Sequence, residues 1–505
     1  MQQVHLRIND AANGKPTPVR LRITDADGRY YAPHGRLTEF ATGPNQDVGG
    51  NVLIGLKPWA YIDGACEILL PPGELHIEIA KGPEYKPINE KIALLAGKMS
   101  MRFTIERWSD LRAQGWHSSD TRTHFLSTEA AALEAAAEDV DLVHLLAKKI
   151  TLRDAFGKAV HAIPNIVAFT GQNLCHANDR HAVAVGTLNE HPVLGSLALL
   201  HCHRVVFPLN FGGPLGREDW TLFDWCEQCH RKKGLVVWTN PLHQTEALTY
   251  GEPLADLILG EVDAFEVTSF ENSPFDAMAD YYQLASAGLI VPLVGASGKD
   301  SNGIALGMMR TYAHLDDSVP FSFAAWIEAV RAGRTYVSNG PLLDVTINGQ
   351  RRGSHIELQT NDGPLIVHAK AKSNVPFDRL ELMWNGDVIA KINASSEWPH
   401  GATLEFKLPA AQSGWLAIRC VGETLLPSRP APQRVFAHTS AIAVRREGSC
   451  DWADAHTVQT LLADLEALLI WAREKARCDT AAERERLCHV FDDARIALAK
   501  KISQA

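Results

Sequence analysis

The residues most capable of chemistry stand together in the segment Asp120-Thr121-Arg122-Thr123-His124. If this segment is a strand, Asp120, Arg122 and His124 point to one face, because side chains alternate along a strand. A carboxylate, a guanidinium and an imidazole on one face could bind an anion, polarise a carbonyl group or transfer a proton. The alternative interpretation is a polar strand end with a buried, hydrogen-bonded histidine. An alanine-rich run predicts a helix over 128–138, and such a strand-to-helix turn is typical of the mouth of a barrel enzyme.

The pattern of apolar and polar residues changes along the chain and predicts a multidomain protein with a β/α barrel at its centre. Apolar runs such as 166–169 and 235–238 alternate with helical segments, as parallel strands buried on both faces do. The alternative for the centre is an open doubly wound sheet. Short alternating runs before and after it predict β-sandwiches. The predicted domains are an N-terminal β-sandwich (1–107), a β/α barrel (108–335), a second β-sandwich (336–446) and a C-terminal helical hairpin (452–502).

Composition excludes several classes of function. The chain has 505 residues, a formal net charge of -10 and 46% hydrophobic residues, which is ordinary for a soluble multidomain protein. An acidic chain does not favour nucleic acid, because a phosphate backbone requires a basic face. We expect no membrane segment, because no run of about 18 apolar residues occurs. The N-terminus lacks the basic and apolar regions of a signal peptide, so we expect a cytoplasmic protein.

The nine cysteines predict reduced thiols rather than a disulfide framework, because they are few and irregularly spaced. Cys226-Glu227-Gln228-Cys229-His230 matches the attachment pattern of c-type haem. That segment also reads as part of an amphipathic helix, so we expect no haem and predict that Cys226 and Cys229 are reduced and buried. No Gly-x-Gly-x-x-Gly loop or P-loop is present, so we expect no nucleotide cofactor.

The string from Trp116 to Ser127 resembles the first motif of the PHP (polymerase and histidinol phosphatase) metallohydrolases, Asp-x-His-x-His. It is most similar to the CehA/McbA-like, or carbaryl hydrolase-like, branch. The segments 189–196, 332–342 and 436–440 also resemble that branch, so the resemblance runs from residue 1 to about 445. It implies a PHP-like, distorted TIM barrel that acts as a hydrolase on an ester, amide, carbamate or phosphoester bond of a small molecule.

The chain departs from the family pattern at metal-binding positions. Arg122, Asn240 and Ser196 stand where the family has histidines, and Val143 stands where it has an aspartate. An arginine cannot give up its proton in a protein, so Arg122 cannot bind a metal. We therefore expect at most one divalent metal, zinc, manganese or iron. Its ligands would be Asp120, His124 and Asp300.

Two hypotheses follow for the barrel. In the first it is a hydrolase in which His124 or His191 acts as general base, and Arg122 and Lys299 stabilise an oxyanion in place of a metal. In the second it is inactive and binds an anionic or sugar-like ligand. For His191 and His117, a structural imidazole is the favoured alternative. The candidate catalytic residues are Asp120, Arg122, His124, His191, Lys299 and Asp300, and the candidate substrate-binding residues are His117, Asn240, His243 and Glu266. The sequence indicates no oligomeric state.

Overall fold

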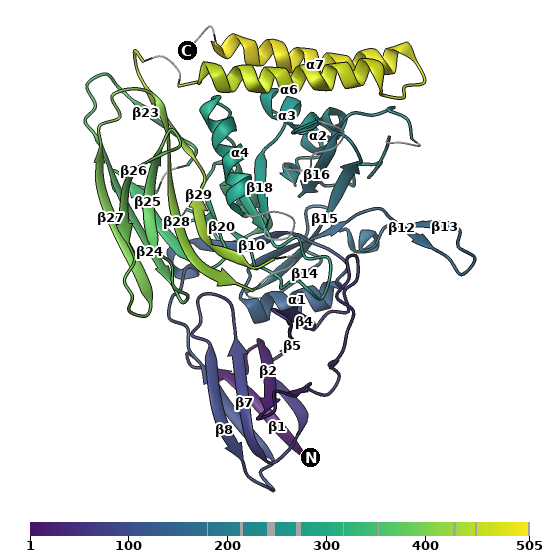
Figure 1. Cartoon of the computed structure of the whole chain (residues 1–505), viewed down its shortest axis with the longest axis vertical. Helices are drawn as coiled ribbons and strands as arrows, with labels where there is room; N and C mark the ends of the chain where they lie inside the picture. The colour runs from purple at the N-terminus through teal and green to yellow at the C-terminus, as the bar shows by residue number, and fades with distance from the viewer. Residues whose placement is uncertain are drawn as a thin grey trace.

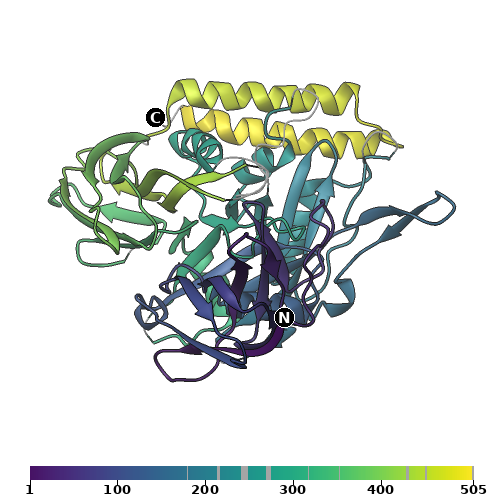
Figure 2. The same ribbon diagram turned by 60° about the horizontal axis from the view of Figure 1, so that its bottom comes forward.

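The computed structural model describes residues 1–178, 180–212, 216–239, 248–268, 274–316, 318–351, 353–427, 431–449 and 452–502. It is a multidomain, sheet-rich protein (Figure 1). An N-terminal β domain lies below a central α/β region in that view, and a second β domain lies beside the central region. Two long C-terminal helices cross the opposite side of the central region, and Figure 2 shows them side by side.

The N-terminal domain consists of two sheets packed on one apolar core. Alternation is visible in β1, where Val4, Leu6 and Ile8 are buried between more exposed residues. One sheet has the order β6-β1-β9 and the other β4-β5-β2-β7-β8, with β3 paired to β2. The strands are β1 (Gln2–Asp10), β2 (Val19–Asp25), β3 (Tyr30–Tyr31), β4 (Asn51–Ile54), β5 (Lys57–Ile62), β6 (Ala65–Leu70), β7 (Gly73–Ala80), β8 (Ile88–Leu94) and β9 (Ser100–Ile105).

The central region is built on the strand order β19-β18-β17-β16-β15-β11-β10-β20-β21. Its first and last parts are parallel: β10 pairs with β11 and β11 with β15, while β17 pairs with β18 and β18 with β19. The strands are β10 (Trp116–Thr123), β11 (Leu142–Ala147), β15 (Ala182–His191), β16 (Gly195–Leu200), β17 (Leu235–Thr239), β18 (Ala264–Thr268), β19 (Leu293–Ala296), β20 (Arg310–His314) and β21 (Thr335–Ser338).

Five helices accompany these strands, and three short strands complete the region. The apolar run 166–169 was expected to be a strand. Instead a 3-10 turn, Ile166–Ala168, forms there, with Val167 97% exposed. The helices are α1 (Thr128–Glu138), α2 (Leu222–Arg231), α3 (Glu252–Ile258), α4 (Pro274–Ser286) and α5 (Phe323–Arg331); the short strands are β12 (Ile150–Arg153), β13 (Ala159–Ala162) and β14 (His176–Ala177).

The prediction of a TIM-like barrel is not confirmed, because the described strands form an open ladder. The parallel order is interrupted twice, since β16 runs antiparallel to both of its neighbours and β20 runs antiparallel to β10. Strands β19 and β10 nevertheless meet. Thr123 and Lys299 form an isolated parallel bridge, and His124 N–H donates to the Lys299 carbonyl at 2.8 Å. The central sheet therefore curls until its edge strand lies against β10.

The C-terminal β domain has two layers, one of which continues the central sheet through β21 and β29. Its other layer has the order β22-β24-β27, and the two layers share one apolar core. Asn385 and Gly386 form a tight hairpin turn, with φ of 50° and 90°. The strands are β22 (Leu342–Ile347), β23 (His355–Leu358), β24 (Leu365–Ser373), β25 (Arg379–Trp384), β26 (Asp387–Asn393), β27 (His400–Leu408), β28 (Gly414–Leu426), β29 (Gln433–Thr439) and β30 (Ile442–Arg446).

The predicted C-terminal helical pair is confirmed. Helices α6 (Ala455–Glu474) and α7 (Ala481–Ile502) pack on each other and on α3, and α6 also packs on α4. Thr480 begins α7: its hydroxyl accepts from Glu483 N–H at 3.2 Å, and the Glu483 carboxylate accepts from Thr480 N–H at 2.9 Å. This reciprocal capping leaves few unpaired donors in the first turn of the helix.

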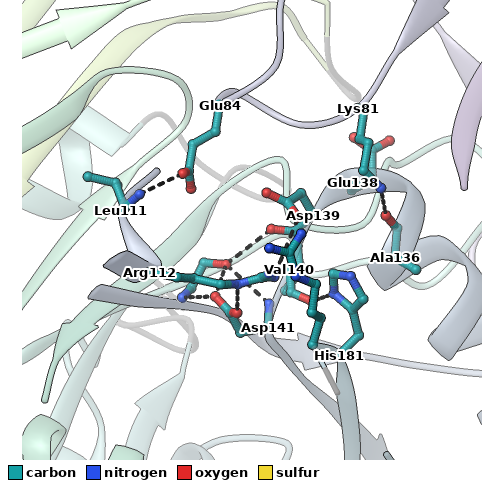
Figure 3. Close-up of polar contacts among 12 residues, drawn as sticks. Lys81, Glu84, Leu111, Arg112, Ala136, Glu138, Asp139, Val140, Asp141 and His181 are labelled. Carbon is teal, nitrogen blue, oxygen red and sulfur yellow. Dashed lines mark hydrogen bonds and ion pairs between the residues drawn. The ribbon is translucent and has the colours of Figure 1, made fainter. Parts of the chain in front are cut away.

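The contact between the N-terminal domain and helix α1 is polar (Figure 3). Lys81 of the N-terminal domain donates to the carbonyl of Ala136 on α1. In the segment that leads from this domain to β10, Arg112 contacts Asp141 and lies 3.4 Å from Asp139. Asp139 ends α1 in the left-handed conformation, with φ of 55°. Buried ion pairs with further hydrogen bonds fix the relative position of two elements, because breaking one leaves an uncompensated charge.

Cys226 and Cys229 are buried on α2 as predicted, and every described cysteine is free. The Cys229 sulfur lies 3.3 Å from that of Cys202 on the neighbouring chain segment. Burial raises the pKa of both α2 thiols well above the usual range, which disfavours the reactive thiolate. Within the described ranges, no helix combines the length and the apolar character needed to cross a bilayer.

His144 provides a test of the packing between β11 and α5. Its ring lies 5.4 Å from that of Phe323 and 5.2 Å from that of Trp326, and neither ring nitrogen has a hydrogen-bond partner in the part of the chain that the structure describes. Burial lowers the pKa of His144 to about 3. In the unfolded chain His144 takes up a proton near pH 6.5, whereas in the folded protein it stays neutral. The free energy of unfolding is therefore highest above that pH and falls as the pH is lowered. His144→Leu should raise the free energy of unfolding at pH 5 by about 2 kcal/mol relative to wild type.

Urea unfolding of both proteins at pH 7 and pH 5 measures this difference. The exposed His161 is the matched control, and His161→Leu should show no such gain between the two pH values. An equal loss of stability for wild type and His144→Leu on acidification would contradict the assignment.

Candidate functional site

A buried ion pair joins β10 to β18. The Arg122 Nε lies 3.1 Å from each carboxylate oxygen of Glu266, and one of its terminal nitrogens lies 2.9 Å from Oε1. The two side chains are 7% and 0% exposed, so water screens the pair only weakly. Glu266, a candidate substrate-binding residue, is thus engaged by Arg122.

His124 lies next to this pair at the end of β10. Its Nδ1 lies 2.9 Å from the carbonyl oxygen of Leu146 and must donate to it, because a carbonyl oxygen can only accept. Its Nε2 is buried and has no hydrogen-bond partner in the described residues. Burial, together with the nearby charges of Lys148 and Arg122, lowers the pKa of His124 well below its usual range. At neutral pH His124 is therefore an uncharged imidazole whose Nε2 carries an unused lone pair.

Asp300 supplies a carboxylate to the same group, after β19. One of its oxygens accepts from the backbone N–H of Asn45 at 3.4 Å, and the other is buried. Burial raises the pKa of Asp300, while the Asn45 N–H and the charges of Lys148 and Arg122 oppose this rise. Asn45 belongs to the loop between β3 and β4, so the N-terminal domain completes this side of the site.

Lys148 is a member of the cluster that the sequence did not suggest. It follows β11 directly and lies with its ammonium 5.5 Å from the centre of the Phe125 ring. Its charge acts on both His124 and Asp300. Its position after a buried strand, at the same end as His124, was the available signal.

Asp120 does not face this cluster. One of its oxygens accepts from Ser297 N–H at 3.0 Å and from Arg122 N–H at 3.3 Å. The other accepts from the Ser297 hydroxyl at 2.5 Å and from Gly307 N–H at 2.8 Å. Both oxygens are occupied by donors, so Asp120 fastens β10 to the segment after β19 and is not placed to contact a substrate.

Lys299 also points away from the cluster, into the interface with the N-terminal domain. Its ammonium lies 2.8 Å from Asp47 and 3.6 Å from Glu134 on α1, and all three side chains are 0% exposed. Burial alone would lower the pKa of Lys299, but Glu134 and Asp47 raise it above the usual value. The structure therefore places Lys299 in an interdomain ion-pair network and not where it was expected, beside Arg122.

The two remaining described candidates lie elsewhere. His117 is near the start of β10, seven residues from His124, which corresponds to about 23 Å along a strand. There it stacks on Phe321. His191 donates from Nε2 to Glu218 at 2.7 Å, while its Nδ1 accepts from two backbone N–H groups. Both histidines therefore make packing or hydrogen-bond contacts within the fold, away from His124. Asn240 and His243 lie outside the described residues.

The donor set does not fit the expected metal site. Of Asp120, His124 and Asp300, the first has both oxygens occupied, and Glu266 is held by Arg122. In the ranges that the structure describes, no three His, Cys, Asp or Glu residues are grouped as metal ligands. The cluster formed by Arg122, Lys148, Glu266, Asp300 and His124 instead places two cations and two carboxylates around a neutral imidazole.

Comparison with known proteins gives no family for the chain. No family model and no curated protein matches it. Among solved structures, PsfC from Pseudomonas syringae PB-5123 is similar at 17% identity and a TM-score of 0.28 over 42% of this chain and 88% of PsfC. A likeness this weak supports no conclusion on fold or function.

The location of Lys299 can be tested by stability. Lys299→Met should lower the free energy of unfolding by about 3–5 kcal/mol, because it leaves Asp47 and Glu134 buried without their counter-charge. Lys148→Met is the matched control and should change stability by no more than about 0.5 kcal/mol, because Lys148 is partly exposed and forms no ion pair in the described residues. Urea unfolding at pH 7 measures both. Wild-type stability of Lys299→Met would place this lysine outside the network.

Proposed function

We propose that the chain is a hydrolase that cleaves an ester, amide, carbamate or phosphoester bond of a small molecule, with fixed cationic side chains in place of metal charge. The observation that carries this proposal is the buried His124 imidazole, whose Nε2 has no hydrogen-bond partner among the described residues and whose neighbours are Arg122 and Lys148. A buried polar atom without a partner is rare in proteins and suggests a function that uses it.

The proposed chemistry assigns each side chain one task. The His124 Nε2 takes a proton from the attacking water and returns it to the leaving oxygen or nitrogen as the scissile bond breaks. Its Nδ1–H, bound to the Leu146 carbonyl, keeps the ring in the required tautomer. Arg122 and Lys148 stabilise the negative charge that develops on the substrate oxygen. Asp300 accepts a hydrogen bond that orients the water. Glu266 holds the guanidinium of Arg122 in place, so Glu266 is a positioning residue.

The proposal also extends to the fold of the central region. A PHP-like, distorted barrel of the CehA/McbA type would bring the carboxyl ends of its strands to one mouth. The contacts between β10 and β19, and the location of Arg122, His124 and Asp300 at or after strand ends, support that description. The resemblance in sequence supports the hydrolytic class of reaction.

One observation favours a second candidate, a barrel that binds an anionic or sugar-like ligand without turnover. Glu266 already neutralises much of the charge of Arg122, and a compensated guanidinium polarises a substrate less strongly. Turnover separates the two candidates, because a binding protein would retain its ligand unchanged.

The experiment is a hydrolysis screen with aryl esters, anilides, N-methylcarbamates and phosphoesters, carried out with and without a chelator. The wild-type protein should turn over at least one class, and the chelator should leave the rate unchanged. His124→Gln should lower kcat by about 10²–10⁴ because it removes the general base. Arg122→Ala should lower it by about 10²–10³ because it removes a charge that stabilises the transition state.

Two controls make this result specific. His117→Gln alters a histidine at the other end of β10 and should retain wild-type activity. The acid limb of the pH–rate profile should lie well below pH 6.5, because His124 remains unprotonated until its lowered pKa is reached. Full activity of a folded His124→Gln variant would remove the imidazole from the mechanism, and binding without turnover would favour the second candidate.

A further inference from the structure

A cavity of about 250 Å³ lies where the three domains meet, away from the cluster around His124. Its lining includes Arg20 from the N-terminal domain, Glu138 and Arg310 from the central region, and Asn374 from the C-terminal domain. Pockets for drug-sized ligands have volumes of about 300–1,000 Å³, so this cavity suits a small molecule. Cavities at domain junctions are frequent binding sites for such molecules.

Arg310 is the most informative residue of this cavity. It is 5% exposed, and it donates from Nε to the carbonyl of Gly307 at 2.8 Å and from a terminal nitrogen to the carbonyl of Glu138 at 3.2 Å. No carboxylate in the described part of the chain lies within ion-pair distance of its guanidinium. A buried guanidinium without a counter-ion is costly, and two carbonyl groups compensate its charge only in part.

The charges around the cavity do not cancel. The carboxylate of Glu138 is engaged by Arg20 and by the hydroxyl of Tyr61, which lies at 2.9 Å. Among the described residues, the charged ones that line the cavity are thus two arginines and one glutamate, which leaves one positive charge. A lining of this kind favours a ligand with one negative charge.

The rest of the lining is largely apolar. It is contributed by Ile54, Ala305, Leu306, Met308, Val375 and Leu426. A free inorganic anion would gain nothing from these side chains, whereas an apolar ligand without charge would leave Arg310 uncompensated. Only a molecule that is apolar at one end and anionic at the other can both pack on the aliphatic side chains and pair with Arg310.

We propose that this cavity binds a small organic anion, with its carboxylate or phosphate group on Arg310 and its apolar body against the surrounding aliphatic side chains. A guanidinium presents two parallel N–H donors that match either anionic group. The bound molecule would also contact the loop before β20. Gly307 in that loop accepts from Arg310 and donates to Asp120 at 2.8 Å, so the ligand would stabilise the segment that fastens β10.

Isothermal titration calorimetry with hexanoate tests this proposal, with hexanol and inorganic phosphate as the two half-molecules. Hexanoate should bind with a stoichiometry of one, and each half-molecule should bind at least about tenfold more weakly because it loses a charged hydrogen bond or the apolar contact. Arg310→Met should weaken hexanoate binding by about tenfold to about a hundredfold. Leu426→Trp should have a similar effect, because it fills the cavity from its half-buried rim and leaves the guanidinium intact.

The exposed Arg102 on β9 provides the matched control, and Arg102→Met should bind hexanoate as wild type does. Circular dichroism establishes that each variant is folded, and the readout is binding, so the result does not depend on hydrolytic activity. Unchanged affinity in a folded Leu426→Trp variant, or equal affinity for hexanol and hexanoate, would overturn the proposal. Absence of hexanoate binding to the wild-type protein would overturn it as well.

Discussion

The carboxylate of Asp120 is the interaction on which the arrangement of the site depends. It accepts four hydrogen bonds, from Ser297, from Gly307 and from the backbone of Arg122, and so ties β10 to the segments that follow β19. No ladder of backbone hydrogen bonds joins these two strands in the described residues, so the side chain supplies much of what fixes their separation. Because the sheet is held curled in this way, Arg122 and His124 on one strand reach Glu266 and Asp300 on others.

The two cations of the cluster disfavour a proton on both His124 and Asp300. Arg122 is one cation of the cluster, and its counter-ion is Glu266. Lys148 adds a second cation, and both cations oppose protonation of the buried His124. The same two cations favour the charged form of Asp300, which burial disfavours. A neutral imidazole next to two fixed cations is suited to accept a proton while a negative charge forms nearby.

Alternation along the sequence predicted part of this site, because Arg122 and His124 do lie on one side of β10. It could not assign Asp120 to the fastening of β19, since that role depends on Ser297 and Gly307, which are distant in sequence. Lys299 and Asp300 were predicted together, but adjacent residues of an extended segment point in opposite directions. Only Asp300 therefore faces the cluster. The contribution of Asn45 had no local signal, because it arises from the packing of one domain on another.

In the fold, too, the sequence predicted features that depend on local patterns but not those that depend on distant contacts. Periodicity predicted some of the short strands of both β domains and the C-terminal helical pair, which are set by local patterns. It did not predict that β16 would pair antiparallel with β15, because both strands are apolar and their hydrophobicity resembles that of parallel strands. The short turn between them, which cannot hold a parallel crossover, was the available signal. Periodicity also assigned a strand to the apolar run 166–169, where half-exposed apolar residues lie in a surface turn. Patterns of hydrophobicity report burial and do not specify strand direction.

Nitrogen-15 NMR of the histidine side chains at pH 7 tests the central claim most directly. His124 can be assigned by comparison with the His124→Gln variant. The structure predicts a neutral ring with the proton on Nδ1, so that Nε2 should show the chemical shift of an unprotonated nitrogen and remain so below pH 6.5. A protonated Nε2 at pH 7, in either the other tautomer or the imidazolium, would contradict the account.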